Sequence, residues 1–279
     1  MTVPEGFAVL PEAPAAAGIA TSVLVHLEFE ARSRARHALS LLDARGDPPS
    51  LPAVLQTAGL AACEPSVLRQ VHGSSVLVLG ARPGEPCPAP ARASGEERRA
   101  RRTADAHVTA DPSVALVICS ADCVPILVAD PGTGAVGAAH AGWRGTADEI
   151  AMRLIESLSR AFGGAPSRLV ALLGPAIGPC CYEVRLDVAS VFRSRFRARE
   201  GFIRETPGER RHSLDLVEAN AWQLTQAGLR PGNILRSGLC TCCRRDLFPS
   251  YRAAGGGAGR LYSVISPRVG LGTLLGGRG

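Results

Sequence analysis

The feature that most constrains the fold is a pair of apolar runs near the middle of the chain. Residues 114–119 (VALVIC) and residues 124–128 (VPILV) are separated by only four residues, 120–123. Continuous runs of this kind predict strands that are buried on both faces. Pro125 indicates a strand start, an edge or a bulge, because proline cannot donate to a sheet ladder.

Other strands and helices are mixed along the chain, which predicts the α+β class. The further strands are expected at 67–71, 76–79, 135–140, 169–173, 234–239 and 261–265. Thr146 and Glu149 form a capping-box pattern that predicts a helix ending at Gly163. A second helix is expected at 186–196, and a third from an N-cap at Ser213 to a stop at Gly228.

The composition is that of a folded globular protein and gives no sign of a nucleic-acid partner. Of the 279 residues, 46% are hydrophobic and 20% charged, which predicts a folded globular chain. The net charge is +6, and all the Lys and Arg positions are arginine. We interpret the basic stretches 80–104 and 193–199 as solvated surface, so no nucleic-acid partner is expected.

The chain also lacks the usual signals for export or membrane insertion. The nine cysteines are an odd number in a long chain, which argues against a disulfide framework. We expect no signal peptide, because no basic region precedes an apolar run at the start of the sequence. The stretch 114–129 is too short and too interrupted to span a membrane. We therefore expect a cytoplasmic protein with reduced thiols and no membrane partner; its oligomeric state stays open.

Three side chains could form a catalytic metal site. His72 and His140 each precede a glycine-rich turn, and Cys123 follows Asp122 between the two apolar runs. Two imidazoles and one thiolate can hold zinc and leave a fourth position open, as catalytic zinc requires. The spacing is no zinc-finger signature, so from these residues alone a buried core cysteine and satisfied histidines remain the alternative.

Two further patterns have a functional and a structural interpretation. The turn from Gly142 to Thr146 enters a predicted helix, where free N–H groups and Arg144 could bind phosphate, or the turn could be a simple cap with an exposed arginine. The cysteines at 180–181 and 240–243 could suggest a second metal site, but we interpret them as buried thiols or loop residues.

An ordered set of motifs gives the chain a specific resemblance. The segments are Gln70-Val71-His72-Gly73, Asp105-Ala106-His107-Val108-Thr109, Ser120-Ala121-Asp122-Cys123-Val124-Pro125, Ala139-His140-Ala141-Gly142-Trp143-Arg144-Gly145, Leu173 through Val184, Ser237-Gly238-Leu239-Cys240-Thr241 and Ser250-Tyr251-Arg252. Over residues 67–266 this resembles the bacterial laccase-domain family, formerly called multicopper polyphenol oxidases. Its members are described as zinc-dependent purine nucleoside phosphorylases with adenosine deaminase activity, or as peptidoglycan editing factors.

The resemblance implies a fold, a cofactor and roles for individual residues. It implies a mixed-sheet α/β sandwich with the metal site in a cleft at strand ends, and zinc rather than copper bound by His72, Cys123 and His140. It also implies phosphate and small nucleosides as partners. Residues 67–279 would form the family core, and residues 1–66 a divergent N-terminal part of the same single domain. The N-terminal part lacks the family's Thr-Arg-x-Gly-Gly segment, which implies a changed side of the substrate pocket.

Four functions follow as hypotheses. In the first, a zinc enzyme splits or deaminates purine nucleosides: Cys123, His140, Asp105 and Asp122 belong to its catalytic centre, and Arg144, Gly142 and Arg252 to its substrate site. The second is a copper phenol oxidase, which six histidines without a His-x-His pair do not favour. The third is a cysteine hydrolase acting on a peptidoglycan precursor, with Cys123 as nucleophile and His140 as base. The fourth is a module that only holds zinc.

Overall fold

Two six-stranded sheets form the body of the protein, whose computed structural model describes residues 3–10, 21–43, 45–80, 102–196, 200–205 and 212–268. The first sheet has the order β1 (Phe7–Leu10), β2 (Val23–His26), β3 (Ala35–Ser40), β15 (Leu261–Pro267), β7 (Val114–Ser120) and β4 (Glu64–Val67). The second has the order β14 (Ile234–Arg236), β10 (Val170–Leu173), β8 (Val124–Ala129), β9 (Val136–Ala141), β6 (Ala106–Thr109) and β5 (Val76–Leu79). Most neighbours are antiparallel, and β4–β7, β5–β6 and β10–β14 pair in parallel.

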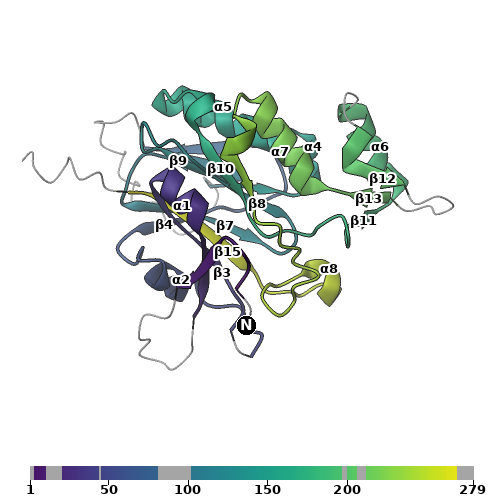
Figure 1. Cartoon of the computed structure of the whole chain (residues 1–279), viewed down its shortest axis with the longest axis horizontal. Helices are drawn as coiled ribbons and strands as arrows, with labels where there is room; N and C mark the ends of the chain where they lie inside the picture. Colours follow the sequence, from purple (N-terminus) through teal and green to yellow (C-terminus); the bar gives the residue numbers. More distant parts are fainter. Residues whose placement is uncertain are drawn as a thin grey trace, which may run out of the picture.

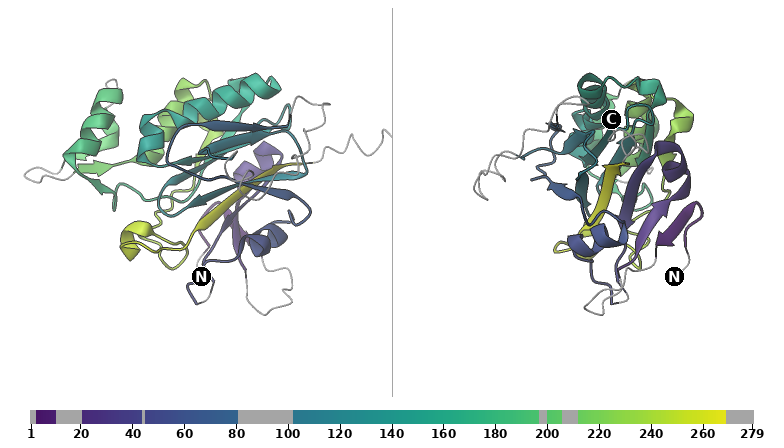
Figure 2. Two further views of the ribbon diagram at one scale, coloured as in Figure 1. Left: turned by 180° about the vertical axis from the view of Figure 1, so that it is seen from behind. Right: turned by 90° about the vertical axis from the view of Figure 1, so that its left-hand side faces the viewer.

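The described helices pack around the two sheets, and some of them cover an outer sheet face (Figure 1). They are α1 (Leu27–Ser33), α2 (Leu51–Thr57), α4 (Trp143–Ala147), α5 (Ile150–Phe162), α6 (Leu186–Arg195), α7 (Leu216–Gln226) and α8 (Tyr251–Ala254). α5 and α7 lie over the second sheet, whereas α2 lies against the first. At one end of the molecule α6 accompanies a small sheet of β11 (Glu183–Val184), β13 (His212–Leu214) and β12 (Ile203–Glu205) (Figures 1 and 2).

The side chains of β7 and β8 show why these strands read as continuous apolar runs. In β7, Leu116 and Ile118 enter the core between the two sheets, while Ala115 and Val117 pack toward α2. In β8, Leu127 lies between the sheets, while Ile126 and Val128 face the core formed with α5 and α7. Because both faces of both strands are buried, no polar alternation is possible. The predicted α/β sandwich of mixed sheets is confirmed.

Several expected elements differ in their boundaries or caps. The predicted capping box is wrong, because Thr146 lies inside α4 and α5 begins after Glu149. Glu149 has a φ of 64°, which interrupts the helical backbone between α4 and α5. The predicted N-cap Ser213 belongs to β13, and Asp215 caps α7 by accepting from the Glu218 N–H. In both places a tertiary partner overrode the local pattern, since Thr146 Oγ1 accepts a buried hydrogen bond from Asn220 and Ser213 Oγ donates to the Pro179 carbonyl at 2.6 Å.

The N-terminal region is more ordered than its weak sequence pattern indicates. Its strands β2 and β3 pair with each other, and β3 pairs with β15 from the other end of the chain. The first sheet therefore runs across the boundary predicted at residue 66. Most of the arginine-rich stretch 80–104 lies outside the described residues.

The apolar stretch 114–129 forms the strands β7 and β8. In the part of the chain that the structure describes, no helix has the length and hydrophobicity needed to cross a bilayer.

Candidate metal centre and active site

The three-residue link between β7 and β8, residues 121–123, carries the chain from one sheet to the other and presents Cys123. Asp122 in this link has φ of 87°, a conformation that is costly for a residue other than glycine. Its carboxylate accepts hydrogen bonds from Thr241 Oγ1 at 2.6 Å and from the Arg252 N–H at 2.7 Å. Its carbonyl accepts from the Ile177 N–H at 2.9 Å. Three segments from distant parts of the sequence thus hold the turn in place.

A second strained turn presents His72. This residue also has a positive φ, 60°. The carboxylate of Asp105 accepts from the backbone N–H groups of Val71 (3.1 Å), His72 (2.9 Å) and Gly73 (2.7 Å). Asp105 is fully buried, so these bonds act where water does not compete. The strand predicted at 67–71 is misplaced: β4 spans Glu64–Val67, and the chain that follows it leads into this turn.

The same carboxylate orients His140, which lies on β9. Its Nδ1 is 3.0 Å from Asp105 Oδ1, and the His140 N–H donates to the Asp105 carbonyl at 2.7 Å. With Nδ1 engaged by the carboxylate, Nε2 is the ring nitrogen left for a ligand. One buried aspartate therefore positions both histidines.

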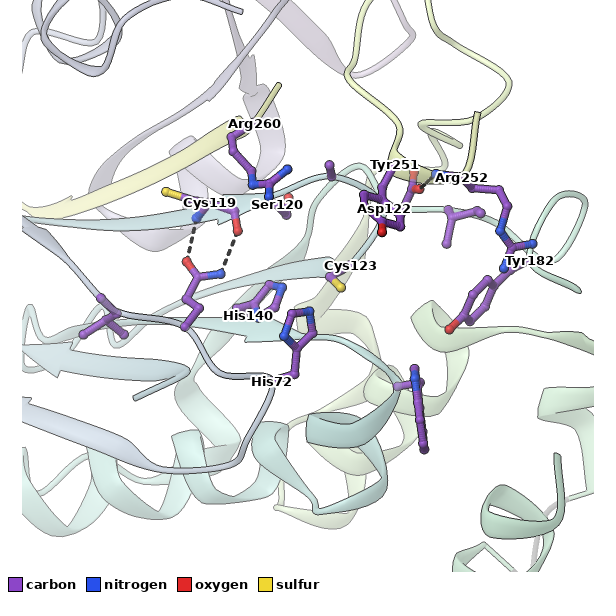
Figure 3. Close-up of a pocket in the computed structure, with 15 residues that line it drawn as sticks. His72, Cys119, Ser120, Asp122, Cys123, His140, Tyr182, Tyr251, Arg252 and Arg260 are labelled. Carbon is purple, nitrogen blue, oxygen red and sulfur yellow. Dashed lines mark hydrogen bonds between the residues drawn. The ribbon is translucent and has the colours of Figure 1, made fainter. Parts of the chain in front are cut away.

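The His72, Cys123 and His140 ligand atoms all lie within 4.8 Å of one another (Figure 3). The two imidazole rings meet edge to face, with centroids 4.8 Å apart. Gly142 permits this approach, since a Cβ there would lie 3.0 Å from Cys123 Sγ and 3.1 Å from His72 Cδ2. Gly145 matters in the same way, because a Cβ on it would meet the Gly73 carbonyl at 2.7 Å.

The electrostatics of the cluster favour a thiolate. Burial raises the pKa of the Cys123 thiol, but hydrogen bonds with His140 and His72 outweigh it and bring the pKa to about 7. Burial lowers the pKa of His140, whereas hydrogen bonds with Asp105 and Cys123 raise it to about 9. A thiolate and two imidazoles are a donor set that fits zinc, with three protein ligands and an open side.

The open side of the cluster faces a pocket of about 610 Å³, within the usual range for small-molecule sites. Its walls combine aromatic rings, arginine side chains and the three clustered side chains. The lining residues are Leu68, Gln70, His72, Cys119, Ser120, Ala121, Asp122, Cys123, His140, Trp143, Ile177, Tyr182, Tyr251, Arg252 and Arg260. Gln70 braces one wall, since its amide donates to the Cys119 carbonyl at 2.7 Å and accepts from the Cys119 N–H at 2.9 Å (Figure 3).

Arg252 and Tyr182 form an organised corner of this pocket. The Arg252 guanidinium donates to the carbonyls of Cys181 (3.1 Å) and Glu183 (3.0 Å) and lies 5.2 Å from the centre of the Tyr182 ring. Burial and the nearby Cys123 raise the pKa of Tyr182 to about 12. Its hydroxyl therefore stays protonated at neutral pH and can act as a donor.

The structure brings some predicted site residues together and separates others. His72, Cys123, His140, Asp122 and Arg252 line the pocket, whereas Asp105 lies behind it. Arg144 is exposed and covers its neighbour Trp143, with its guanidinium carbon 4.3 Å from the ring centre. Gly142 is buried behind Cys123 and His72.

Sequence reasoning missed several residues of the pocket. Trp143 and Tyr182 stood inside quoted motifs but without a role, and Arg260 follows a glycine-rich stretch that shows no sign of function. Among the described residues, those that line the pocket begin at Leu68. Residues 11–20 of the N-terminal part lie outside the described residues.

Comparison with known proteins agrees with the motifs. The sequence profile of the family described as multi-copper polyphenol oxidoreductase laccase matches residues 51–268. Purine nucleoside phosphorylase YlmD of Geobacillus stearothermophilus is 42% identical over 166 residues, which are 59% of this chain and 60% of the relative. Adenosine deaminase RL5, from an unknown prokaryotic organism, is 32% identical over 197 residues, 71% of this chain and 72% of the relative.

Solved structures agree over a longer stretch. The crystal structure of YlmD from Geobacillus stearothermophilus superposes with a TM-score of 0.74 at 28% identity, covering 92% of this chain and 99% of that one. YfiH of Bacillus licheniformis, a hypothetical protein, gives a TM-score of 0.68 at 26% identity, covering 88% and 96%. In sequence, the chain spans about 60% of the length of the first curated relatives that it matches.

Proposed function

Because the chain belongs to the multi-copper polyphenol oxidoreductase laccase family, we propose that it is a metal-dependent purine nucleoside phosphorylase that also deaminates adenosine. The observation that carries the proposal is the His72–Cys123–His140 cluster opening into an aromatic and cationic pocket of about 610 Å³. The relatives named above supply the substrate class, and adenosine, inosine, guanosine and methylthioadenosine are the nucleosides to test.

Zinc is the proposed metal, held by His72, Cys123 and His140. Two imidazoles and one thiolate suit zinc, and when bound it supplies Lewis-acid polarisation and a lowered pKa for water. Asp105 is a positioning residue in this proposal, because it is buried and acts through His140 and the His72 turn. The remaining four histidines, His26, His37, His107 and His212, lie outside the cluster, so the structure offers no support for a multicopper centre.

The pocket walls suggest where each part of the substrate binds. The rings of Trp143, Tyr182 and Tyr251 are suited to packing against a purine, and Arg252 and Arg260 to holding phosphate. In phosphorolysis, a phosphate oxygen forms a bond to C1′ while the C1′–N9 bond breaks and its electron pair moves to the purine. The protonated Tyr182 hydroxyl can donate a hydrogen bond to the base as this charge develops.

The test is an assay of base release and deamination. Purified protein is incubated with inosine or adenosine, with and without phosphate, and the products are separated by chromatography. We expect phosphate-dependent release of hypoxanthine or adenine, conversion of adenosine to inosine, and loss of both in Cys123→Ser. Cys63→Ser is a matched control, since Cys63 lines a different cavity. No base release from any of the four nucleosides by metal-loaded protein would refute the proposal.

One specific observation keeps a metal-free cysteine hydrolase as the second candidate. Asp105, His140 and Cys123 are arranged as an orienting carboxylate, a base and a thiolate nucleophile. The two functions differ in how zinc affects alkylation by iodoacetamide. Zinc bound to Cys123 protects the thiol from alkylation, whereas a metal-free nucleophile reacts equally fast with or without zinc.

A further inference from the structure

A second group of sulfur atoms meets outside the pocket, on two loops that follow neighbouring strands. Cys180 and Cys181 lie in the loop after β10, and Cys240 and Cys243 in the loop after β14. The four Sγ atoms all lie within 4.8 Å of one another. Cys243 Sγ is 3.6 Å from Cys180 Sγ and 3.5 Å from Cys181 Sγ.

These separations match the edges of a tetrahedral metal–thiolate site. Zinc–sulfur bonds of about 2.3 Å place the sulfurs of a tetrahedron about 3.8 Å apart. A disulfide would require about 2.05 Å, and all four cysteines are free. Even a separation at the upper bound of 4.8 Å would close to the tetrahedral edge if each of the two sulfurs moved by about 0.5 Å. The span leaves room for one ion only.

The backbone around the sulfurs holds the two loops together independently of any ion. Ala176 and Cys240 form a parallel bridge, in which the Thr241 N–H donates to the Ala176 carbonyl at 3.0 Å. The Gly178 N–H donates to Cys240 Sγ at 3.3 Å, an interaction that stabilises a ligating thiolate. A Cβ on Gly178 would lie 3.3 Å from Cys180 Sγ, so the turn leaves no spare room beside the sulfurs.

All four cysteines are loop residues, as one of the two structural interpretations expected, whereas the other, buried thiols, is wrong for two of them. Cys180 and Cys243 are exposed, and Cys181 and Cys240 are half-buried. Cys240 and Cys243 also have the C-x-x-C spacing common in zinc sites, which is concealed by the intervening Cys242. Exposed, reduced thiols packed this closely are poorly explained by core packing.

We propose that Cys180, Cys181, Cys240 and Cys243 bind a second, structural zinc ion that ties the loop after β10 to the loop after β14. A closed site with four thiolate ligands has no open position for water, so it would have no catalytic role. This proposal does not depend on the activity of the pocket.

The position of the cluster gives the ion a consequence for the pocket. The loop that carries Cys181 continues into Tyr182, and the Cys181 carbonyl accepts from the Arg252 guanidinium. Beside Cys240, Thr241 donates to Asp122, the residue that supports the turn of Cys123. A zinc ion that joins the two loops would therefore fix the position of Tyr182 and Arg252 relative to the turn that carries Cys123. Its loss should loosen substrate binding more than it alters the reaction at the first metal.

Metal counting by native mass spectrometry tests the proposal on the full chain, expressed with zinc and purified without chelator. We expect two zinc ions per chain in the wild type and one in Cys243→Ser. Cys123→Ser should also hold one ion. When cobalt replaces that ion, an intense sulfur-to-cobalt charge-transfer absorption should show a tetrahedral site with four sulfur ligands. Cys242→Ser is the matched control and should keep both ions. Because Cys180 is exposed, Cys180→Ser provides a second variant that removes a ligand without disturbing the core.

Thiol reactivity gives an independent readout. Cys180 and Cys243 should react slowly with a thiol reagent in the zinc-loaded protein and quickly after chelation. Three results would overturn the proposal. The wild type could bind a single ion that Cys243→Ser retains, the bound metal could be iron instead of zinc, or the intact mass could reveal a disulfide among these cysteines. Loss of the second ion in Cys242→Ser together with its retention in Cys243→Ser would also overturn it.

Discussion

Asp105→Asn tests the central claim that one buried carboxylate builds the metal site. The carboxylate accepts four hydrogen bonds, two on each oxygen: His72 N–H and His140 Nδ1 on Oδ1, Val71 N–H and Gly73 N–H on Oδ2. Burial raises the pKa of Asp105, but bonds from His140, Gly73 and Val71 lower it below its ordinary value, so the group is charged at neutral pH. An asparagine fits the same space, but its NH2 group cannot accept.

The magnitude follows from counting the bonds that are lost. Whichever oxygen becomes NH2, two donors lose their acceptor in a buried site. Hydrogen bonds to a charged group contribute about 1.5–3 kcal/mol each, so the free energy of unfolding should fall by about 3–6 kcal/mol. The metal affinity should fall about 10- to 100-fold, as expected when the partner of a ligating histidine is removed.

Urea denaturation and competition with a chromogenic chelator measure the two effects. Asp130→Asn is the matched control, since Asp130 is also fully buried and accepts from the Gly132 N–H and Arg168, at the other end of β8. It should lower stability without weakening metal binding. If Asp105→Asn binds metal as tightly as the wild type, or if Asp130→Asn weakens binding equally, Asp105 does not position the ligands.

Three further predictions follow from the same structure. Gly142→Ala should weaken metal binding about tenfold by pushing its Cβ against Cys123 and His72, whereas Gly232→Ala, whose Cβ meets nothing, should leave chelator competition unchanged. Arg252→Gln should raise the KM for phosphate about ten- to hundredfold with a smaller change in kcat, and an unchanged KM in steady-state assays would remove it from the phosphate site. Burial lowers the pKa of His107 to about 3, so below pH 6.5 the unfolded chain binds a proton that the folded chain rejects. His107 should therefore cost about 2 kcal/mol of stability between pH 8 and pH 5, a loss that His107→Gln abolishes and His212→Gln does not; equal urea midpoint shifts in all three proteins would contradict this.

The sequence alone predicted the long central strands but not β1–β3, β6 or β11–β13. It also singled out His72, Cys123 and His140, which the structure brings together. β7 and β8 were predictable because strands covered on both faces leave no room for polar residues, and these runs are local in the chain. His72, Cys123 and His140 could be chosen because so few histidines exist and because two of them adjoin glycine turns. Helix caps were less predictable. Thr146 is a common N-cap residue type, but its hydroxyl accepts a hydrogen bond from Asn220 in the core instead.

Only the tertiary structure decided which residues meet. The sequence places Asp105 in the catalytic centre, as a proton carrier or as a partner of the metal-binding residues, and only the structure shows that it is buried behind two histidines that lie 33 and 35 residues away. Arg260 and Arg252 reach one pocket because β15 pairs with β7 and because Asp122 holds the backbone of Arg252. The four clustered cysteines come from loops about 60 residues apart. Contacts of this kind depend on how strands order themselves in a sheet, and sheet order is set by the burial of whole faces rather than by any local pattern.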